Sequence, residues 1–227
     1  MSTNDFYPPS QSYQEPLRTL RRLPVFFLLD TSQETIGTIA VALQQGLSIV
    51  RDQLQRDSRT AGCAYLSYTL FGEHHRYSRL CSPWYFEVPY WQAAGPSFLL
   101  PAVEQLRVAF QTELLVSYPG TQEDYPPLIF LLLGSQPLDQ WQETAISLTN
   151  LSDRTKPLFI TLVTDPALVP LAQPIGRFQF QLARRSGECM TDFFYWAAQA
   201  IGHLYERYFN EASITLPTLP TNIIRLR

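Results

Sequence analysis

The apolar run Leu23–Leu29 ends on an acid and then a hydroxyl residue, Asp30 and Ser32, and this ending constrains the fold more than any other feature of the chain. An unbroken apolar run bounded by a turn is typical of a β-strand that is covered on both faces. Apolar residues then recur at helical spacing from Ile36 to Val50, which predicts a helix after the strand. In open α/β sheets, ligands bind beyond the carboxyl ends of such strands, so Asp30 and Ser32 are candidate site residues.

Strand-like and helix-like segments continue to alternate along the chain. The sequence predicts further strands at 63–71, 77–81, 128–133, 157–163 and 178–182, the last of these being the final strand, and helices at 97–116, 138–151 and 191–209. This order predicts an α/β fold: a doubly wound, mostly parallel sheet with helices on both faces. We expect one domain at 21–209, between a flexible N-terminal arm at 1–20 and a Pro-containing C-terminal tail at 210–227.

Composition limits the classes of partner. The formal net charge of −3 provides no overall attraction to nucleic acid or to an anionic membrane. The apolar runs are too short to span a bilayer. Three cysteines do not make a disulfide framework, which favours a reducing compartment. We therefore expect a cytoplasmic protein with neither a nucleic-acid nor a membrane partner.

The residues at the end of the first strand allow two interpretations. A cluster of carboxylate and hydroxyl oxygens, such as Asp30 and Ser32 provide, suits a hard divalent cation such as Mg²⁺. Alternatively, either residue simply caps the helix that follows, as both residue types commonly do.

Six segments, spread from the first strand to the C-terminus, carry a resemblance to a known family. They are Asp30-Thr31-Ser32-Gln33-Glu34, Gln45-Gly46-Leu47, Gly95-Pro96-Ser97-Phe98-Leu99, Leu133–Trp141, Asp192–Trp196 and Leu216–Pro220. In this order they resemble the motifs of the von Willebrand factor A (vWA) domain, particularly the bacterial TerY-like group associated with tellurium resistance. The first segment resembles Asp-x-Ser-Gly-Ser, the core of the metal-ion-dependent adhesion site (MIDAS) of that family. The resemblance implies the same α/β fold.

The resemblance also implies a metal site, from which this chain departs. Asp30, Ser32 and Ser97 would be ligands, and Ser97 keeps the hydroxyl of the family's threonine. Gly134 stands where the family has a second aspartate, and Glu34 replaces the second serine of the first motif. Glu34 could supply the missing charge, or its bulk could fill the cavity. These departures predict a degenerate site, with either no cofactor or weakly bound Mg²⁺.

An aromatic loop at 82–94 precedes Ser97. We consider Trp84, Tyr90 and Trp91 candidate partner contacts, because exposed Trp and Tyr are favoured anchors at protein interfaces. The alternative is that these rings cover one face of the sheet. Asp165 follows another strand and either lines the crevice or supports a turn beside Pro166.

The preferred interpretation is a non-enzymatic protein-protein interaction module, an adaptor that binds another protein through its strand-end face. The chain has no Gly-x-Ser-x-Gly motif and no phosphate-binding glycine loop, and no catalytic residue is assigned. Two alternatives remain: a magnesium-dependent hydrolase or phosphatase that uses the Asp30 crevice, and a structural subunit of a larger assembly. Similarity to the TerY-like group further implies a bacterial tellurite or stress response.

Overall fold

The computed structural model describes residues 21–115, 122–151 and 156–226. Within these ranges the chain forms a sheet of seven strands in the order β3-β2-β1-β4-β5-β6-β7. The strands are β1 (Leu23–Asp30), β2 (Ala64–Phe71), β3 (Arg76–Tyr77), β4 (Leu128–Leu133), β5 (Leu158–Val163), β6 (Phe178–Leu182) and β7 (Ile223–Arg225). The five central strands are parallel, and β3 and β7 run antiparallel at the two edges. The predicted α/β class is confirmed.

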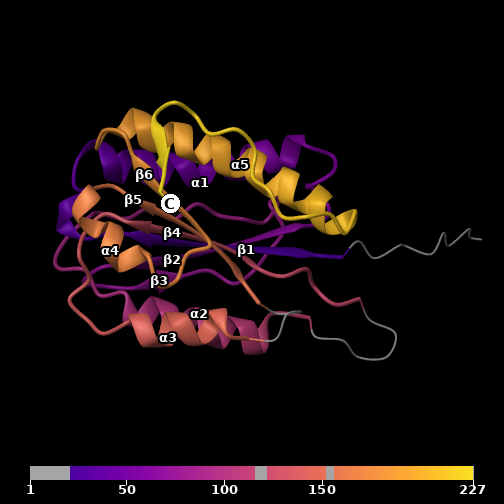
Figure 1. Cartoon of the computed structure of the whole chain (residues 1–227), viewed down its shortest axis with the longest axis horizontal. Coiled ribbons are helices and arrows are strands. Elements are labelled where there is room, and N and C mark those ends of the chain that lie inside the picture. Colours follow the sequence, from indigo (N-terminus) through magenta and orange to yellow (C-terminus); the bar gives the residue numbers. More distant parts are fainter. Residues whose placement is uncertain (1–20, 116–121, 152–155, 227) are drawn as a thin grey trace, which may run out of the picture.

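Helices cover both faces of the sheet (Figure 1). One layer contains α1 (Thr38–Arg56) and α5 (Gly187–Phe209), the other contains α2 (Leu100–Thr112) and α3 (Gln142–Thr149), and the short α4 (Val169–Ala172) precedes β6. Successive side chains of a strand point to opposite faces, which divides β1 between two apolar cores. Val25 and Phe27 pack into the core under α1 and α5, whereas Phe26 and Leu28 pack into the core over α2 and α3. Burial on both faces explains why β1 is an unbroken apolar run.

The contact between α1 and α5 depends on a glycine. A Cβ atom at Gly46 would lie only 2.1 Å from Cδ2 of the Phe194 ring. The ring therefore packs directly against the backbone of α1, and both residues are buried in the same core. This close approach sets the spacing between α1 and α5, and α1 begins shortly after β1 ends.

Several predicted boundaries differ from the structure. The helix expected from residue 191 begins at Gly187, where the Ser186 side chain accepts a hydrogen bond from the Cys189 amide and caps it. The helices expected from residues 97 and 138 begin later, at Leu100 and Gln142. The strand expected at 77–81 is reduced to Arg76–Tyr77, followed by an isolated bridge between Cys81 and Leu66.

The expectation that Phe178–Leu182 is the final strand is wrong. Residues 223–225 form β7, which pairs antiparallel with β6 and closes that edge of the sheet. Three residues with two apolar side chains give too short a period-two signal to be recognised in sequence. The predicted tail at 210–227 thus contributes a strand, while the predicted arm at 1–20 lies outside the described residues.

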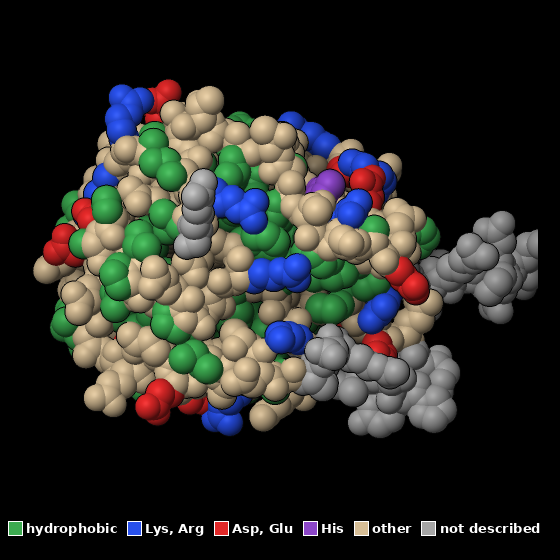
Figure 2. Space-filling view, viewed as in Figure 1, with side chains coloured by type: hydrophobic (Ala, Val, Ile, Leu, Met, Phe, Trp, Pro, Cys, Tyr) green, Lys and Arg blue, Asp and Glu red, His purple; other side chains and the backbone are tan. Residues whose placement is uncertain are grey.

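The surface and the helices offer three further observations. On the face in Figure 2, Lys and Arg side chains stand in separate groups among hydrophobic and uncharged polar ones. Near the β6–β7 edge, the guanidinium groups of Arg177 and Arg225 lie 5.5 and 5.4 Å from the ring centroid of Phe178. Of the helices in the described ranges, none has the length and apolar character needed to cross a membrane.

Candidate functional site

Asp30 is the last residue of β1, and its carboxylate is buried, with a residue exposure of 1%. Oδ1 accepts a hydrogen bond from the Ser32 amide at 2.9 Å. Oδ2 accepts one from the Gly134 amide at 3.1 Å and another from Ser135 Oγ at 2.6 Å. Because Gly134 and Ser135 follow β4, the carboxylate ties together the carboxyl ends of two adjacent strands.

A chain of hydroxyl groups continues from this carboxylate. Ser135 Oγ donates to Asp30, so Ser32 Oγ, 2.9 Å away, is the donor to Ser135 Oγ. The Ser32 side chain does not cap the 3₁₀ turn η1 (Gln33–Thr35) that follows it. The capping alternative therefore fails for Ser32, and Asp30 bonds the amide two residues on, in the manner of an Asx turn.

Ser97 lies just before α2, with 3% exposure, and its hydroxyl oxygen has no hydrogen-bond partner in the described structure. Asp139 caps that helix instead: its two carboxylate oxygens accept from the amides of Leu99 and Leu100, at 3.1 and 2.7 Å. The Ser97 carbonyl accepts from the Leu138 amide at 2.9 Å, which holds the segment after β4 against the start of α2.

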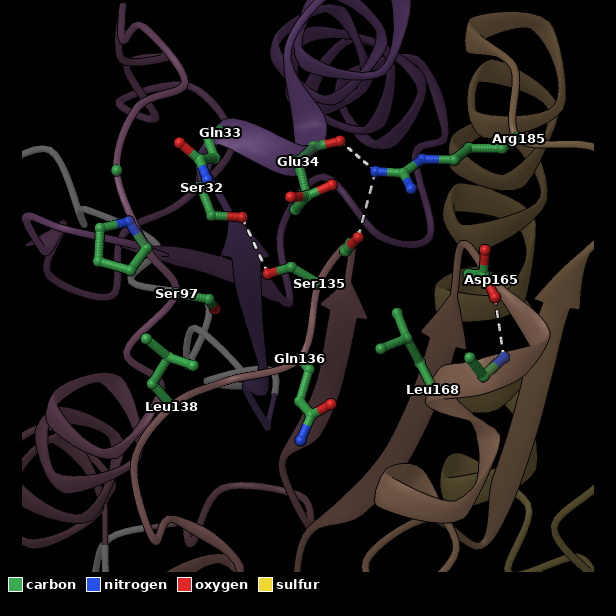
Figure 3. A pocket seen from close by; sticks show the side chains of 14 residues that line it. Ser32, Gln33, Glu34, Ser97, Ser135, Gln136, Leu138, Asp165, Leu168 and Arg185 are labelled. Carbon is green, nitrogen blue, oxygen red and sulfur yellow. Dashed lines mark hydrogen bonds between the residues drawn. The ribbon is translucent and has the colours of Figure 1, made fainter.

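These segments enclose a pocket of about 400 Å³ at the carboxyl ends of the central strands (Figure 3). Residues from five segments line it: Ser32, Gln33 and Glu34; Gly95, Pro96 and Ser97; Gly134, Ser135, Gln136 and Leu138; Asp165, Ala167 and Leu168; and Arg185. The structure thus brings together all four predicted metal-site residues, with Asp30 immediately behind the lining and the other three in it.

The ionised groups of the lining differ in their contacts. Arg185 Nη2 donates to the carbonyl oxygens of Glu34 and of Gly134, the latter at 3.3 Å (Figure 3). The Glu34 residue is exposed, and within the described ranges its carboxylate makes neither a hydrogen bond nor an ion pair. Asp165 Oδ1 accepts from the Ala167 amide at 2.8 Å, so Asp165 both supports the predicted turn and lines the pocket.

Two residues that sequence reasoning did not assign to the site are central to it. Ser135 directly follows buried strand β4, as Asp30 and Ser32 end β1, and that parallel placement was the available signal. Arg185 lies between β6 and α5. It reaches the site because β6 stands beside β5 in the sheet, and this strand order leaves no signal in the local sequence.

The aromatic loop divides between the two predicted roles. Trp84 and Tyr90 are 63% and 70% exposed. Trp91 is half-buried against the core under α1 and α5, and its indole nitrogen has no partner in the described residues. Gln55, near the end of α1, donates to the Pro83 carbonyl at 2.8 Å. Trp84 therefore lies at the end of α1 away from the pocket.

Comparison with solved structures gives 13% identity to a von Willebrand factor type A protein from Catenulispora acidiphila, with a TM-score of 0.58 over 80% of this chain and 43% of that one. The chain has the vWA fold. A pilus adhesin from Lactobacillus rhamnosus GG aligns at 8% identity and TM-score 0.62, over 83% of this chain and 31% of the adhesin. Proximal thread matrix protein 1 of the mussel byssus aligns at 9% identity and TM-score 0.56, over 80% and 48%.

These similarities concern the fold alone, and this chain spans less than half the length of each of these proteins. The mussel protein has also been solved with a zinc-occupied MIDAS motif, at TM-score 0.52 to this chain. No protein-family model and no curated protein matches the sequence.

The vWA fold implies a divalent metal at this place, but the residues present do not fit a tightly held ion. Of the two predicted carboxylate ligands, Asp30 already accepts three hydrogen bonds, and Glu34 is exposed. Ser135 Oγ stands between Asp30 and Ser32, which are two of the predicted ligands. The described residues contain no group of three His, Cys, Asp or Glu side chains placed to hold a metal. Mg²⁺ demands near-octahedral oxygen ligands, and this arrangement does not supply them.

Proposed function

We propose that this chain is a non-enzymatic protein-protein interaction module that binds another protein through its strand-end face without a bridging metal ion. The observation that carries the proposal is the closed hydrogen-bond network of Asp30, Ser32 and Ser135. Protein donors already occupy three of the roughly four acceptor positions of the Asp30 carboxylate. The surrounding pocket remains open to a group from a partner.

The rim of the pocket supports this role. Leu138 is 69% exposed and lines the pocket. Interfaces combine apolar contact area with polar groups, and Leu138 beside this polar cavity offers both. Trp84 and Tyr90 offer a second exposed surface on the aromatic loop.

Two finer parts of the proposal derive from the resemblance to TerY-like proteins. It implies that the chain acts as an adaptor in a bacterial tellurite or stress response, and that its setting is the cytoplasm. Growth of a deletion strain of the source organism on tellurite, with and without the restored gene, tests the first part. Equal growth would remove the stress assignment and leave the interaction module standing.

A pull-down with two matched variants tests the interaction face. Leu138→Glu places a charge at the rim of the pocket, and Val108→Glu makes the same change at a 43% exposed position of α2 outside the pocket lining. We expect a specific partner to be captured equally in magnesium and in EDTA, to be lost with Leu138→Glu and to be kept with Val108→Glu. Loss of capture in EDTA would contradict the metal-free mechanism. Equal capture by both variants would contradict the proposed face.

The assignment as a non-enzyme has its own test. A phosphatase in the Asp30 crevice would need the carboxylate as a nucleophile or as a metal ligand, yet the carboxylate is buried and already accepts three hydrogen bonds. We therefore expect no turnover of generic phosphatase substrates with magnesium. Turnover that Asp30→Asn abolishes would establish the enzyme alternative.

A further inference from the structure

The strand-end pocket has an excess of negative charge. Its lining contains two carboxylates, Glu34 and Asp165, and one guanidinium, Arg185, which gives a net formal charge of −1. Asp30, directly behind the lining, adds a second negative charge. None of the ion pairs formed within the described ranges involves Glu34 or Asp165.

Helix N-termini at this edge of the sheet offset part of that charge, because each is equivalent to roughly half a positive charge. Two of them already have partners: Asp139 caps α2 and Ser186 caps α5. Arg185 is likewise engaged, since its Nη2 donates to the Glu34 and Gly134 carbonyl oxygens. The ionised groups of the lining that have no ion-pair partner within the described ranges, Glu34 and Asp165, are therefore acceptors, and the side-chain amides of Gln33 and Gln136 can either donate or accept.

One buried acceptor points independently to a ligand. Ser97 Oγ lines the pocket, its residue is 3% exposed, and its oxygen has no partner in the described structure. Leaving a buried hydroxyl without a hydrogen bond costs about 1–3 kcal/mol, which a donor that enters the pocket would recover. A donor that enters the pocket can reach this oxygen, and the carboxylates of Glu34 and Asp165 line the same pocket.

We propose that the strand-end pocket takes a cationic side chain, lysine or arginine, from the partner protein. The proposal rests on the interaction function proposed above and gives its chemistry. A metal ion in this position would present positive charge and attract an acid. Without it, Glu34, Asp165 and Ser97 present acceptors, and the preferred charge of the partner is reversed. The volume of about 400 Å³ leaves room for an extended basic side chain.

Short peptides test this independently of the unknown partner. Two blocked tripeptides, with a central arginine or a central aspartate, are titrated into the ¹⁵N-labelled full chain at low salt, and amide shifts are followed by NMR. We expect the arginine peptide to move the amides of Glu34, Ser97, Gly134 and Asp165, and the aspartate peptide to leave them unmoved. Stronger binding of the aspartate peptide at these amides, or no binding of either peptide, would overturn the proposal.

Three variants separate binding from folding. Glu34→Gln and Asp165→Asn each remove one charge, and the side-chain amide oxygen introduced by Asp165→Asn can still accept from the Ala167 amide. Each should weaken the arginine peptide roughly two- to fivefold, the range for partly exposed ion pairs. Ser97→Ala should weaken it as well, by roughly threefold, without lowering the midpoint of thermal unfolding, because it removes an unpaired hydroxyl. Asp52→Asn, which lies on α1 and pairs with Arg51, is the control and should change nothing.

The same variants distinguish failure of this inference from failure of the interaction function. If the pull-down partner is captured by wild type and equally by the Glu34→Gln/Asp165→Asn double variant, the interaction module stands and the cationic ligand is refuted. Capture that falls in the double variant but persists with Asp52→Asn supports both proposals.

Discussion

Replacing Gly134 by alanine is expected to destabilise the fold through a clash with Thr35. A Cβ atom at Gly134 would lie 2.3 Å from Thr35 Cγ2. Since carbon atoms pack at about 3.5–4.0 Å, one of the two groups must move by more than about 1 Å. Thr35 has little freedom to do so, because it is 0% exposed and its Oγ1 donates to the Ser32 carbonyl at 2.8 Å. Gly134 is in turn tied to Asp30 through its amide.

The size of the effect follows from this restraint. Adding a methyl group to a well-packed interior typically costs about 1–3 kcal/mol. With both partners hydrogen-bonded, we expect the upper part of that range, about 2–3 kcal/mol in the free energy of unfolding. For a domain of roughly 200 residues this corresponds to a fall of about 5–10 °C in the unfolding midpoint.

Urea denaturation followed by circular dichroism measures the free energy of unfolding. The matched variant is Thr35→Ser, which removes Cγ2 and keeps the hydroxyl that bonds Ser32. In the double variant Thr35→Ser/Gly134→Ala, most of the loss should be recovered, giving a coupling energy of about 1 kcal/mol or more. A Gly134→Ala variant within about 0.5 kcal/mol of wild type, or a coupling energy near zero, would mean that Thr35 does not resist the added methyl group.

Four further outcomes are expected. Gly46→Ala should lower the free energy of unfolding by about 1–3 kcal/mol, measured in urea, because the new Cβ would lie 2.1 Å from the Phe194 ring; an unchanged value would mean that α1 and α5 separate freely. Asp139→Ala should lower it by about 1–2 kcal/mol through loss of the α2 cap, and Asp139→Asn by less; equal losses would contradict a capping role. Magnesium should leave the unfolding midpoint of wild type unchanged. It should raise the midpoint of the double variant Thr35→Ser/Gly134→Asp, which sets a second carboxylate beside Asp30. A rise in wild type would contradict the metal-free site. Burial raises the pKa of the Cys63 thiol from 9.0 to about 11. The free energy of unfolding should therefore be unchanged below pH 9 and decline by about 2 kcal/mol at most as the pH rises to about 11. Cys63→Ala should flatten this decline.

Strands buried on both faces were predictable because their burial leaves an unbroken apolar run, as in β1 and β4. The short edge strand β7 was not, because three residues carry no readable period. Helix starts were misplaced where the capping residue was not identified in the sequence. Ser186 caps α5 through its own hydroxyl, whereas α2 is capped by Asp139, which is distant in sequence.

The candidate site was predictable only in part. Asp30 and Ser32 could be placed at a ligand-binding edge because the end of a parallel strand defines that edge. The contacts of their side chains could not, since Ser135 and Gly134 approach them from β4 across more than a hundred residues of chain. The exposures of Trp84 and Trp91 differ within one loop, because packing against α1 and the sheet, rather than residue type, decides which ring is buried.

The layered α/β architecture and the edge of the sheet that holds the site could be predicted from sequence, because apolar periodicity and strand-end chemistry are local properties of the chain. The chemical character of that site depends on contacts between distant segments. Which oxygen of Asp30 meets which donor, whether Ser97 finds a partner and which carbonyl groups hold Arg185 all depend on distances of a few ångströms between segments that only folding brings together. Hydrogen bonds and charges act over that range, so the chemistry of the pocket is a property of the fold and not of any single motif.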